Sequence, residues 1–445
     1  MTQVKKIGIV GAGLVGTLMA TYLAKRGYTV NIFEGRADPR KAGASGGRSI
    51  NLALSNRGWL PLKEIGLEER VEKMVIPMRG RMMHDDQGFL TFQPYGREGQ
   101  AINSISRGGL NEVLMDEAEK NGVKIYFEHK CVGVNFDESI LYFERDGKRG
   151  KYQADVIIGA DGAYSVVRRL LQRTERFNYS QYYIEHGYKE LSIPAASNGG
   201  FQIEKNSLHI WPRGNYMLIA LPNQDASFTC TLFFPFEGET SFASMKTDED
   251  IRNFFETTFP DAYELMPTLL KDYHFNPTCS LVTVKCFPWA KNKTLLIGDS
   301  SHAIVPFYGQ GMNSGFEDCR VLNEMLDQHD DNWEKVIPAF QVNRKPEADA
   351  ISDLALQNFV EMRDLVADEN FLLRKKIEAK LQDLYPQKWV PLYSMVTFKE
   401  NLKYTEALSI GEKQKAIMDK VMASDNISKN WESIDFESIV NQLEA

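Results

Sequence analysis

The sequence lacks the marks of several protein classes. Its five cysteines form no Cys-x-x-Cys pair, so neither a disulfide framework nor a zinc knuckle can be read from it. No window approaches the roughly 18 apolar residues of a membrane span, and the first residues run straight into an apolar strand, so we expect neither an anchor nor a signal peptide. Lys and Arg number 52 against 60 Asp and Glu, a net charge of −8, which argues against an extended nucleic-acid surface. The histidines show no metal-ligand spacing, so no metal is proposed. These absences favour a soluble, reduced, cytoplasmic protein.

The sequence does have 33 glycines, and the first cluster lies inside a βαβ unit. We predict buried strands at 6–10 and 29–33, with a helix between them that ends at Gly27. Gly11, Gly13 and Gly16 form a G-x-G-x-x-G turn after the first strand, and Glu34 closes the second. Such a turn lets a pyrophosphate approach the helix N-terminus, while the carboxylate accepts hydrogen bonds from a ribose diol. This site favours FAD or NAD over NADP.

Two further glycine sites follow buried strands later in the chain. Asp161-Gly162 follows the predicted strand 154–159, although an aspartate there could simply cap the next helix. Gly298-Asp299 follows the predicted strand 294–297, and a glycine loop then opens a long helix at Gly311, Met312 and Asn313. That helix start would stabilise the negative charge of a reduced flavin, although it could also be an ordinary glycine-rich helix entry. The order of the three sites favours one extended FAD.

The remaining sequence predicts an antiparallel layer and a helical end. Segments between about 181 and 290 alternate in polarity and are rich in aromatics, and they predict strands at 208–212, 216–222 and 228–234. After Gln310 the chain reads as helices broken at Pro346, Pro386 and Pro391. The predicted fold class is α/β, a Rossmann-like FAD-binding domain interrupted by an antiparallel-sheet substrate domain and followed by a helical C-terminal region. We expect the FAD domain at 1–80, 101–178 and 290–345, the substrate sheet at 81–100 and 179–289, and the helices that close the pocket at 346–445.

The three glycine motifs, in this order, resemble those of the class A flavoprotein aromatic hydroxylases, the hydroxybenzoate-hydroxylase-like enzymes. Longer segments are similar to the branch of this family that hydroxylates kynurenine: 48–58, 78–84, 93–96, 186–191, 305–313, 358–362 and 391–398. The resemblance implies tightly bound FAD, with its ADP part on the first site and its ribityl chain near Asp299. It also implies Arg107 on the flavin side, and NADPH as a transient co-substrate without a Rossmann domain of its own.

The resemblance further implies a pocket for the substrate. Its α-carboxylate would be held by Arg81 and Tyr95, with Asn358 and Tyr393 in the same pocket, because a guanidinium offers a planar fork to a carboxylate and a phenol adds a directional donor. Plainer roles remain open for each: a solvated charge for the arginine, a backbone partner for the amide and ordinary packing for the tyrosines.

Three residues of the late glycine motif have other expected roles. We expect Phe307 and Tyr308 to face the flavin ring and to contact the substrate. His302 invites a catalytic interpretation, but we expect it to pack or hydrogen-bond within the flavin loop.

The expected function is an FAD-dependent monooxygenase that converts L-kynurenine to 3-hydroxykynurenine with NAD(P)H and O₂, through a flavin C4a-hydroperoxide. The substrate's own amine activates the ring carbon, so no catalytic protein base is assigned. Three alternatives remain open: a hydroxylase of another aromatic acid, a flavin reductase or dehydrogenase without oxygen insertion, and a non-enzymatic flavin-binding scaffold. We expect a monomer or a homodimer.

Overall fold

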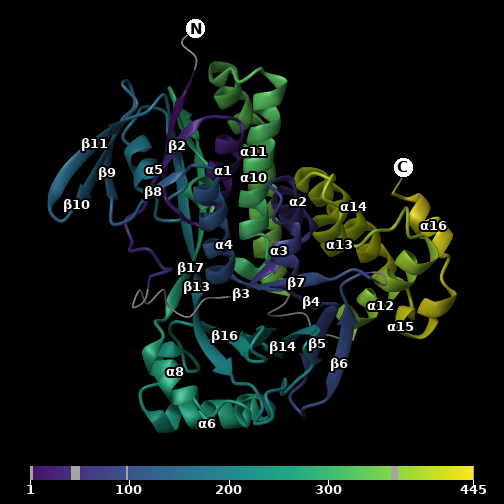
Figure 1. Cartoon of the computed structure of the whole chain (residues 1–445). Helices are drawn as coiled ribbons and strands as arrows, with labels where there is room; N and C mark the ends of the chain where they lie inside the picture. Colours follow the sequence, from purple (N-terminus) through teal and green to yellow (C-terminus); the bar gives the residue numbers. More distant parts are fainter. Residues whose placement is uncertain (1–3, 42–50, 97–98, 362–368, 444–445) are drawn as a thin grey trace. The chain divides into compact units, whose positions relative to one another are not determined.

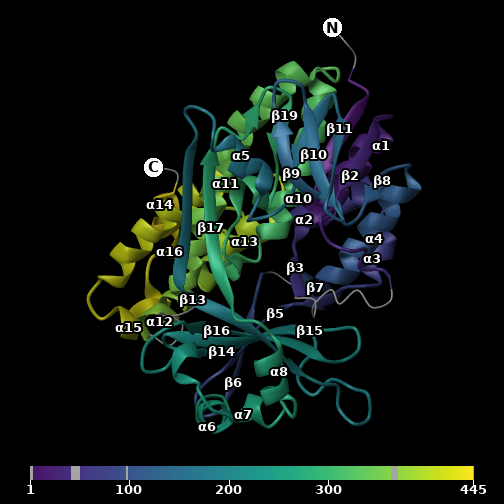
Figure 2. The same cartoon turned by 90° about the vertical axis from the view of Figure 1, so that its left-hand side faces the viewer.

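The computed structural model describes residues 4–41, 51–96, 99–361 and 369–443 (Figures 1 and 2). The chain divides into two compact units. Unit 1 comprises Met1–Val75, Asn103–Ile184 and Leu281–Ser352, and unit 2 comprises Ile76–Ile102, Glu185–Ser280 and Asp353–Ala445. Residues 48–50 and 362, which belong to two of the segments quoted above, lie outside the described residues.

Unit 1 is built on a six-stranded sheet in the order β18-β19-β12-β1-β2-β8. The central strand β1 pairs in parallel with β2 and β12, which confirms the predicted βαβ unit. Its β-branched side chains Ile7 and Ile9 are fully buried, as expected for a parallel sheet covered on both faces. The strands are β1 (Lys6–Val10), β2 (Thr29–Phe33), β8 (Lys124–Tyr126), β12 (Val156–Gly159), β18 (Ala290–Lys291) and β19 (Thr294–Leu296).

Helices and two small sheets complete unit 1. Helix α1 packs against α4 and α10, so the first and the last glycine motifs begin neighbouring helices. The helices are α1 (Leu14–Lys25), α2 (Asn56–Glu64), α3 (Glu68–Glu72), α4 (Arg107–Lys120), α5 (Val166–Leu171), α9 (Asp299–His302), the 3₁₀ turn η2 (Pro306–Tyr308), α10 (Gly311–Gln328) and most of α11 (Trp333–Val360). The small sheets contain β3 (Asn51–Leu54) with β7 (Ile102–Ser106), and β9 (Lys130–Asn135), β10 (Ile140–Arg145) and β11 (Lys148–Gln153).

Unit 2 contains the predicted antiparallel layer, whose strands β14, β15 and β16 coincide with the aromatic-rich segments. The sheet order is β17-β13-β16-β15-β14-β5-β6, and β5 pairs with β14 in parallel. Helices α6, α7 and α8 share a core with the sheet that includes Trp211, Phe228 and Phe255. The elements are β4 (Ile76–Met78), β5 (Gly80–His84), β6 (Leu90–Pro94), β13 (Asn178–Ile193), β14 (Ser207–Arg213), β15 (Tyr216–Pro222), β16 (Phe228–Pro235), β17 (Cys279–Phe287), the 3₁₀ turn η1 (Phe242–Ser244), α6 (Asp248–Thr258), α7 (Pro260–Tyr263) and α8 (Leu269–Phe275).

The C-terminal helices form a core of their own around Trp389 and Met418. They are α12 (Glu369–Leu384), α13 (Leu392–Phe398), α14 (Tyr404–Met422), α15 (Ile427–Asn430), the 3₁₀ turn η4 (Trp431–Ser433) and α16 (Phe436–Asn441). Pro386 and Pro391 fall between helices, as predicted. Within the described residues, no helix combines the length and the apolar character needed to span a bilayer.

The predicted helix break at Pro346 was wrong, because α11 continues through it from Trp333 to Val360. A proline removes the hydrogen bond to the carbonyl four residues earlier, here that of Val342. Val342 is 65% exposed, so water can satisfy the freed oxygen on that side. Burial of apolar side chains such as Phe340 and Ile351 on the helix offsets the remaining cost.

Candidate functional site

The first glycine turn has the shape that a pyrophosphate requires. Gly11 has φ +102°, and a Cβ there would lie 2.5 Å from the carbonyl oxygen of Ala160. A Cβ on Gly16 would lie 2.1 Å from the carbonyl oxygen of Gly11, so the first turn of α1 packs directly on the glycine turn. At Gly13, by contrast, a Cβ would meet nothing within 4 Å. The space beside Gly13, directly before α1, is therefore open, and the N-terminus of a helix favours an anion.

Glu34 lies against this turn, as the motif predicts. Its Oε2 accepts a hydrogen bond from the Ala12 N–H at 2.9 Å, and its Oε1 accepts the backbone N–H and the Nε–H of Arg36, both at 2.9 Å. Burial would raise the pKa of Glu34, but Arg36 and the Ala12 N–H outweigh it and lower the pKa. The structure thus presents an ionised carboxylate beside the turn, as recognition of a ribose diol requires.

The second site combines a turn with a helix cap. The Asp161 carboxylate accepts the backbone N–H groups of Val166 and Val167 at 2.7 and 3.2 Å and the hydroxyl of Ser165 at 2.5 Å. Burial raises the pKa of Asp161 in spite of these donors. Its oxygens thus serve the N-terminus of α5. The neighbouring Gly162 has φ +78° and open space at its Cβ position, which leaves the backbone of this turn accessible to a ligand.

The third site places a partly buried carboxylate at the end of β19. Gly298 has φ +60° and starts α9, whose first residue is Asp299. The Asp299 carboxylate accepts no hydrogen bond from any residue that the structure describes. Burial raises its pKa, against the pull of Arg107, the first residue of α4. A carboxylate with open lone pairs in this position can accept hydrogen bonds from the hydroxyls of a ribityl chain.

At the start of α10, the predicted cofactor residue Asn313 makes hydrogen bonds within the protein. Asn313 donates from Nδ2 to the carbonyl oxygens of Ala53 and Gly309 at 2.9 and 2.7 Å, and its Oδ1 accepts the Ser55 N–H at 3.0 Å. Its amide thus fastens β3 to α10, which leaves cofactor contacts here to the backbone. Met312 packs against the core of unit 1, and a Cβ on Gly311 would touch only Ile304, at 3.8 Å.

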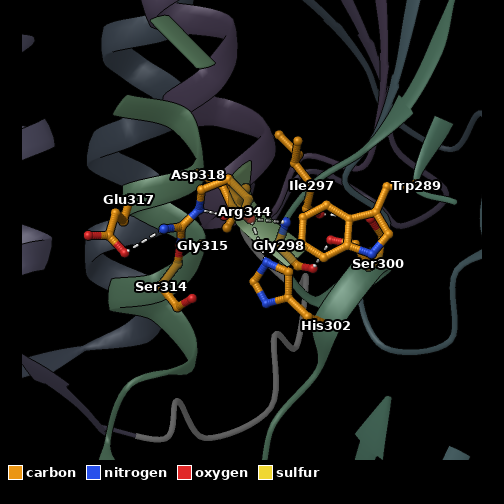
Figure 3. Close-up of polar contacts among 12 residues, drawn as sticks. Trp289, Ile297, Gly298, Ser300, His302, Ser314, Gly315, Glu317, Asp318 and Arg344 are labelled. Carbon is orange, nitrogen blue, oxygen red and sulfur yellow. Dashed lines mark hydrogen bonds and ion pairs between the residues drawn. The ribbon is translucent and has the colours of Figure 1, made fainter. Parts of the chain in front are cut away.

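The structure contains a buried ionic network next to the third site that the sequence analysis did not predict (Figure 3). Asp318 on α10 accepts the Gly298 N–H at 2.8 Å, lies 2.6 Å from His302 Nε2, and accepts the Arg344 Nε–H at 2.9 Å. Burial would raise the pKa of Asp318, but His302 and Arg344 outweigh it and lower the pKa to about 2. The structure confirms that His302 hydrogen-bonds inside this region. The carboxylate therefore holds the turn that carries Asp299.

The network extends along α10 to a second pair of charges. Glu317 lies between Arg344 and Arg57, with N–O distances of 2.9 and 2.8 Å, and all three side chains are at least nine-tenths buried. A signal for it was present in the sequence. Two adjacent acids fall among the apolar residues Phe316 and Cys319 of one helix, and buried acids need paired charges.

Unit 2 brings together three of the predicted substrate residues. The Arg81 guanidinium carbon lies 4.7 Å from the ring centroid of Tyr393 and 5.6 Å from that of Tyr95. The two rings stack at 5.3 Å with an interplanar angle of 16°. Arg81 Nε is buried and has no hydrogen-bond partner among the described residues. This position excludes an ordinary solvated charge and leaves a buried donor that an anion can satisfy.

A carboxylate that we had not anticipated lies near this cluster. Burial alone would lower the pKa of Arg81, but Tyr393, Tyr95 and Glu361 outweigh it and raise the pKa. Glu361 Oε1 lies 3.3 Å from Lys375 Nζ of α12. Its position three residues after Asn358 was the available signal, because residues at that spacing share a helix face.

The other predicted substrate residues lie elsewhere on the chain. Asn358 is 6% exposed on α11, in unit 2, where its side chain already has partners. Phe307 and Tyr308 are buried in η2, in unit 1, directly before α10. The structure thus joins Arg81, Tyr95 and Tyr393 in unit 2 and keeps the two aromatics of the glycine loop with the dinucleotide turns.

The dinucleotide turns and the Rossmann-like sheet define an FAD-binding flavoprotein. Residues 3–335 match the family described as FAD binding domain. Among solved structures, 2-methyl-3-hydroxypyridine-5-carboxylic acid oxygenase is similar, with a TM-score of 0.69 and 18% identity over 82% of this chain and 94% of that one. The tetracycline destructase Tet(51) is also similar, with a TM-score of 0.62 and 20% identity over 87% and 99%. These two likenesses show that the chain shares the fold of these proteins.

Sequence comparison with curated relatives identifies the family within this class of flavoproteins. The chain is 51% identical to kynurenine 3-monooxygenase of Christiangramia forsetii, over 100% of this chain and 99% of the relative. It is 50% identical to the enzyme of that name from Flavobacterium johnsoniae, over 98% of each, and 45% identical to that of Anopheles gambiae, over 95% and 87%. The chain belongs to the kynurenine 3-monooxygenase family.

Proposed function

We propose that this protein is an FAD-dependent monooxygenase that hydroxylates L-kynurenine at C3, with NAD(P)H and O₂ as co-substrates. One observation carries the proposal: identity of 41–51% over nearly the whole chain with relatives of that name. The arginine–tyrosine cluster of unit 2 supports it, because this substrate carries a carboxylate.

Bound FAD, reduced by the nicotinamide, supplies the activation of oxygen. The residues of unit 1 bind and orient it. The turn at Gly11–Gly16 would take the pyrophosphate, Glu34 the adenosine ribose and Asp299 the ribityl hydroxyls. The start of α10 at Gly311 would direct its N–H groups toward negative charge on the reduced ring system.

Arg81 would bind the substrate α-carboxylate through its guanidinium fork. The Arg81 Nε–H, which has no partner among the described residues, can donate one hydrogen bond to the carboxylate. The phenol of the flanking Tyr95 or Tyr393 can donate a second one. The Glu361 carboxylate offers an opposite charge for the α-ammonium group, in exchange for its present pair with Lys375. Together these groups match a zwitterionic amino acid better than a simple aromatic acid.

No protein base is assigned to the hydroxylation itself. The amine of the substrate donates electron density to its ortho carbon, so the ring is already nucleophilic. The protein needs only to orient the ring and exclude water.

The product of a reaction with kynurenine, NADPH and ¹⁸O₂ tests the proposal. One labelled oxygen on the aromatic ring supports it. Turnover of hydroxybenzoate or salicylate in preference to kynurenine would favour a hydroxylase of another acid. Reduction of FAD without label in any product would favour a reductase.

A further inference from the structure

A buried chain of polar groups crosses unit 2 from α7 to the loop before β14. Asp261 Oδ2 lies 2.6 Å from His84 Nδ1, His84 Nε2 lies 2.8 Å from His209 Nδ1, and His209 Nε2 lies 2.7 Å from the carbonyl oxygen of Glu204. His84 and His209 are 3% and 1% exposed. No step of the proposed reaction uses these residues.

The distances determine how many protons the chain holds. A carbonyl oxygen only accepts, so His209 Nε2 must carry a hydrogen toward Glu204. Each of the other two contacts also needs one hydrogen, since otherwise two lone pairs would face each other at hydrogen-bond distance. Three hydrogens are therefore required, whereas two neutral imidazoles beside a carboxylate supply only two. The chain holds one additional proton.

The two neighbours of His84 differ in their affinity for that proton. Burial lowers the pKa of His209 to about 4, so His209 is the neutral ring that accepts through Nδ1. Burial would raise the pKa of Asp261, but His84 and the indole N–H of Trp211, 2.8 Å from the same oxygen, lower it. The His84 ring thus lies between an ionised carboxylate and a neutral imidazole, and it stacks on Trp211 with a centroid distance of 3.9 Å.

The other charged group near this ring is also held in place. Arg213 donates to the carbonyl oxygens of His84 and Asp85 at 3.0 and 2.9 Å and to that of Thr258 at 2.7 Å. Asp261 and His209 thus contact the His84 ring, and Arg213 contacts its carbonyl group. These contacts join the end of β5 to β14 and to the α6–α7 segment.

We propose that His84 is a positioning residue, held as an imidazolium between Asp261 and His209, which fixes strand β5 and thereby the guanidinium of Arg81. The two residues are three apart on one strand, so their side chains lie on opposite faces of the sheet. His84 anchors the strand from the face covered by α7, and Arg81 uses the other. The substrate part of this inference rests on the proposed function.

The proton count can be tested without substrate by ¹⁵N NMR of the histidine rings at pH 7.5. We expect the His84 ring, assigned through its absence from the His84→Gln spectrum, to carry hydrogens on both nitrogens. This state should be lost in the Asp261→Asn variant, which lacks the countercharge. A neutral His84 ring in the wild-type protein at pH 7.5 would overturn the proposal, whatever the binding data show.

The positioning role is tested by binding of L-kynurenine to the FAD-loaded protein. We expect His84→Gln to raise the Kd by about tenfold or more, because a charge-assisted hydrogen bond to the strand is lost. The matched control is His274→Gln, which removes an exposed histidine–aspartate pair with Asp248 in the same unit and should leave the Kd unchanged.

Other outcomes separate the two proposals. If His84→Gln does not fold, binding of L-kynurenine is measured with the Asp261→Asn variant instead, and the same rise in Kd is expected. Wild-type affinity in a folded His84→Gln variant would overturn the positioning role. A wild-type protein that binds no kynurenine at all would refute the proposed function, while the NMR proton count would still decide the state of His84.

Discussion

Arg81 is the residue on which the proposed substrate specificity depends most. Arg81→Gln removes the charge and the fork that a carboxylate requires, so we expect the Kd of L-kynurenine to rise by about 100-fold, or about 3 kcal/mol. Titration of the FAD-loaded variant with kynurenine measures this. Arg79→Gln is the matched control, because the Arg79 side chain is exposed two residues earlier. Similar affinities for both variants would contradict the assignment.

The buried Asp318 carboxylate should make the stability of the folded protein depend on pH in acidic solution. Its pKa is about 2 in the folded chain, against about 3.9 for an aspartate in an unfolded chain. Because the folded value is the lower one, the stabilisation is complete above about pH 4 and is lost as the pH falls toward 2. The shift corresponds to roughly 2–3 kcal/mol.

The variant Asp318→Asn should lose this part of the acid dependence. Urea unfolding between pH 4 and pH 2 is the measurement, and a smaller change than in the wild-type protein is expected. Asp327→Asn on the same helix is the control, because that side chain is 65% exposed and should leave the dependence as it was. Equal slopes for Asp318→Asn and the wild-type protein would show that the buried network does not titrate as proposed.

At the scale of single elements, two glycines of the turn between β1 and α1 should have different roles. Gly16 is needed for folding, whereas Gly13 is needed for cofactor binding. A methyl group on Gly13 meets open space in the protein, so Gly13→Ala should leave the thermal stability of the apoprotein unchanged and weaken FAD binding by at least about tenfold. Gly16→Ala places a Cβ 2.1 Å from a backbone oxygen and should lower the stability of the apoprotein itself. Thermal unfolding and FAD titration of both apoproteins distinguish the two effects; FAD binding by Gly13→Ala at wild-type affinity would place the pyrophosphate elsewhere.

Pro346 is one of two prolines inside helix α11, and tertiary packing compensates for the backbone hydrogen bond that it removes. Pro346→Ala restores one backbone hydrogen bond and relieves the ring clash, so we expect the free energy of unfolding to rise by about 1 kcal/mol, after the entropy gained by the unfolded chain is subtracted. Denaturant unfolding measures the change. Pro391→Ala is the control, because Pro391 caps α13 and interrupts no helical hydrogen bond. A destabilised Pro346→Ala variant would show that the proline conformation is needed in α11.

The helices and strands show which features of the fold local sequence patterns predict and which they do not. The strands at 216–222 and 228–234 were predicted to within a residue, because alternating polarity is a local property. The break at Pro346 was wrong because tertiary packing of Phe340 and Ile351 outweighed a local penalty. Asp161 shows the same limit, since only the fold reveals that its oxygens cap α5.

At the scale of the whole molecule, the proposed function predicts coupling between its two sites. Reduction of FAD without substrate would waste the nicotinamide and release peroxide, so binding of the carboxylate by Arg81 should accelerate reduction. We expect NADPH oxidation by the holoenzyme to be at least about tenfold faster with kynurenine than without it, an effect of about 1.4 kcal/mol on the barrier. Equal rates would contradict the coupling. The Arg81→Gln variant, assayed at the same kynurenine concentration, should show the slower rate.

The sequence by itself determined the class of this protein: three glycine motifs follow buried strands in the order that one extended FAD requires, and they can be read without coordinates because strand, turn and helix start are adjacent in the chain. The relatives then specified the family. Only the tertiary structure decided which charges are buried and what they pair with. Asp318, His302 and Arg344 meet from three helices, and Asp261, His84 and His209 from a helix and two strands. Such contacts join residues distant in sequence, and the low polarity of the interior, which sets the protonation of these groups, exists only once the chain has folded.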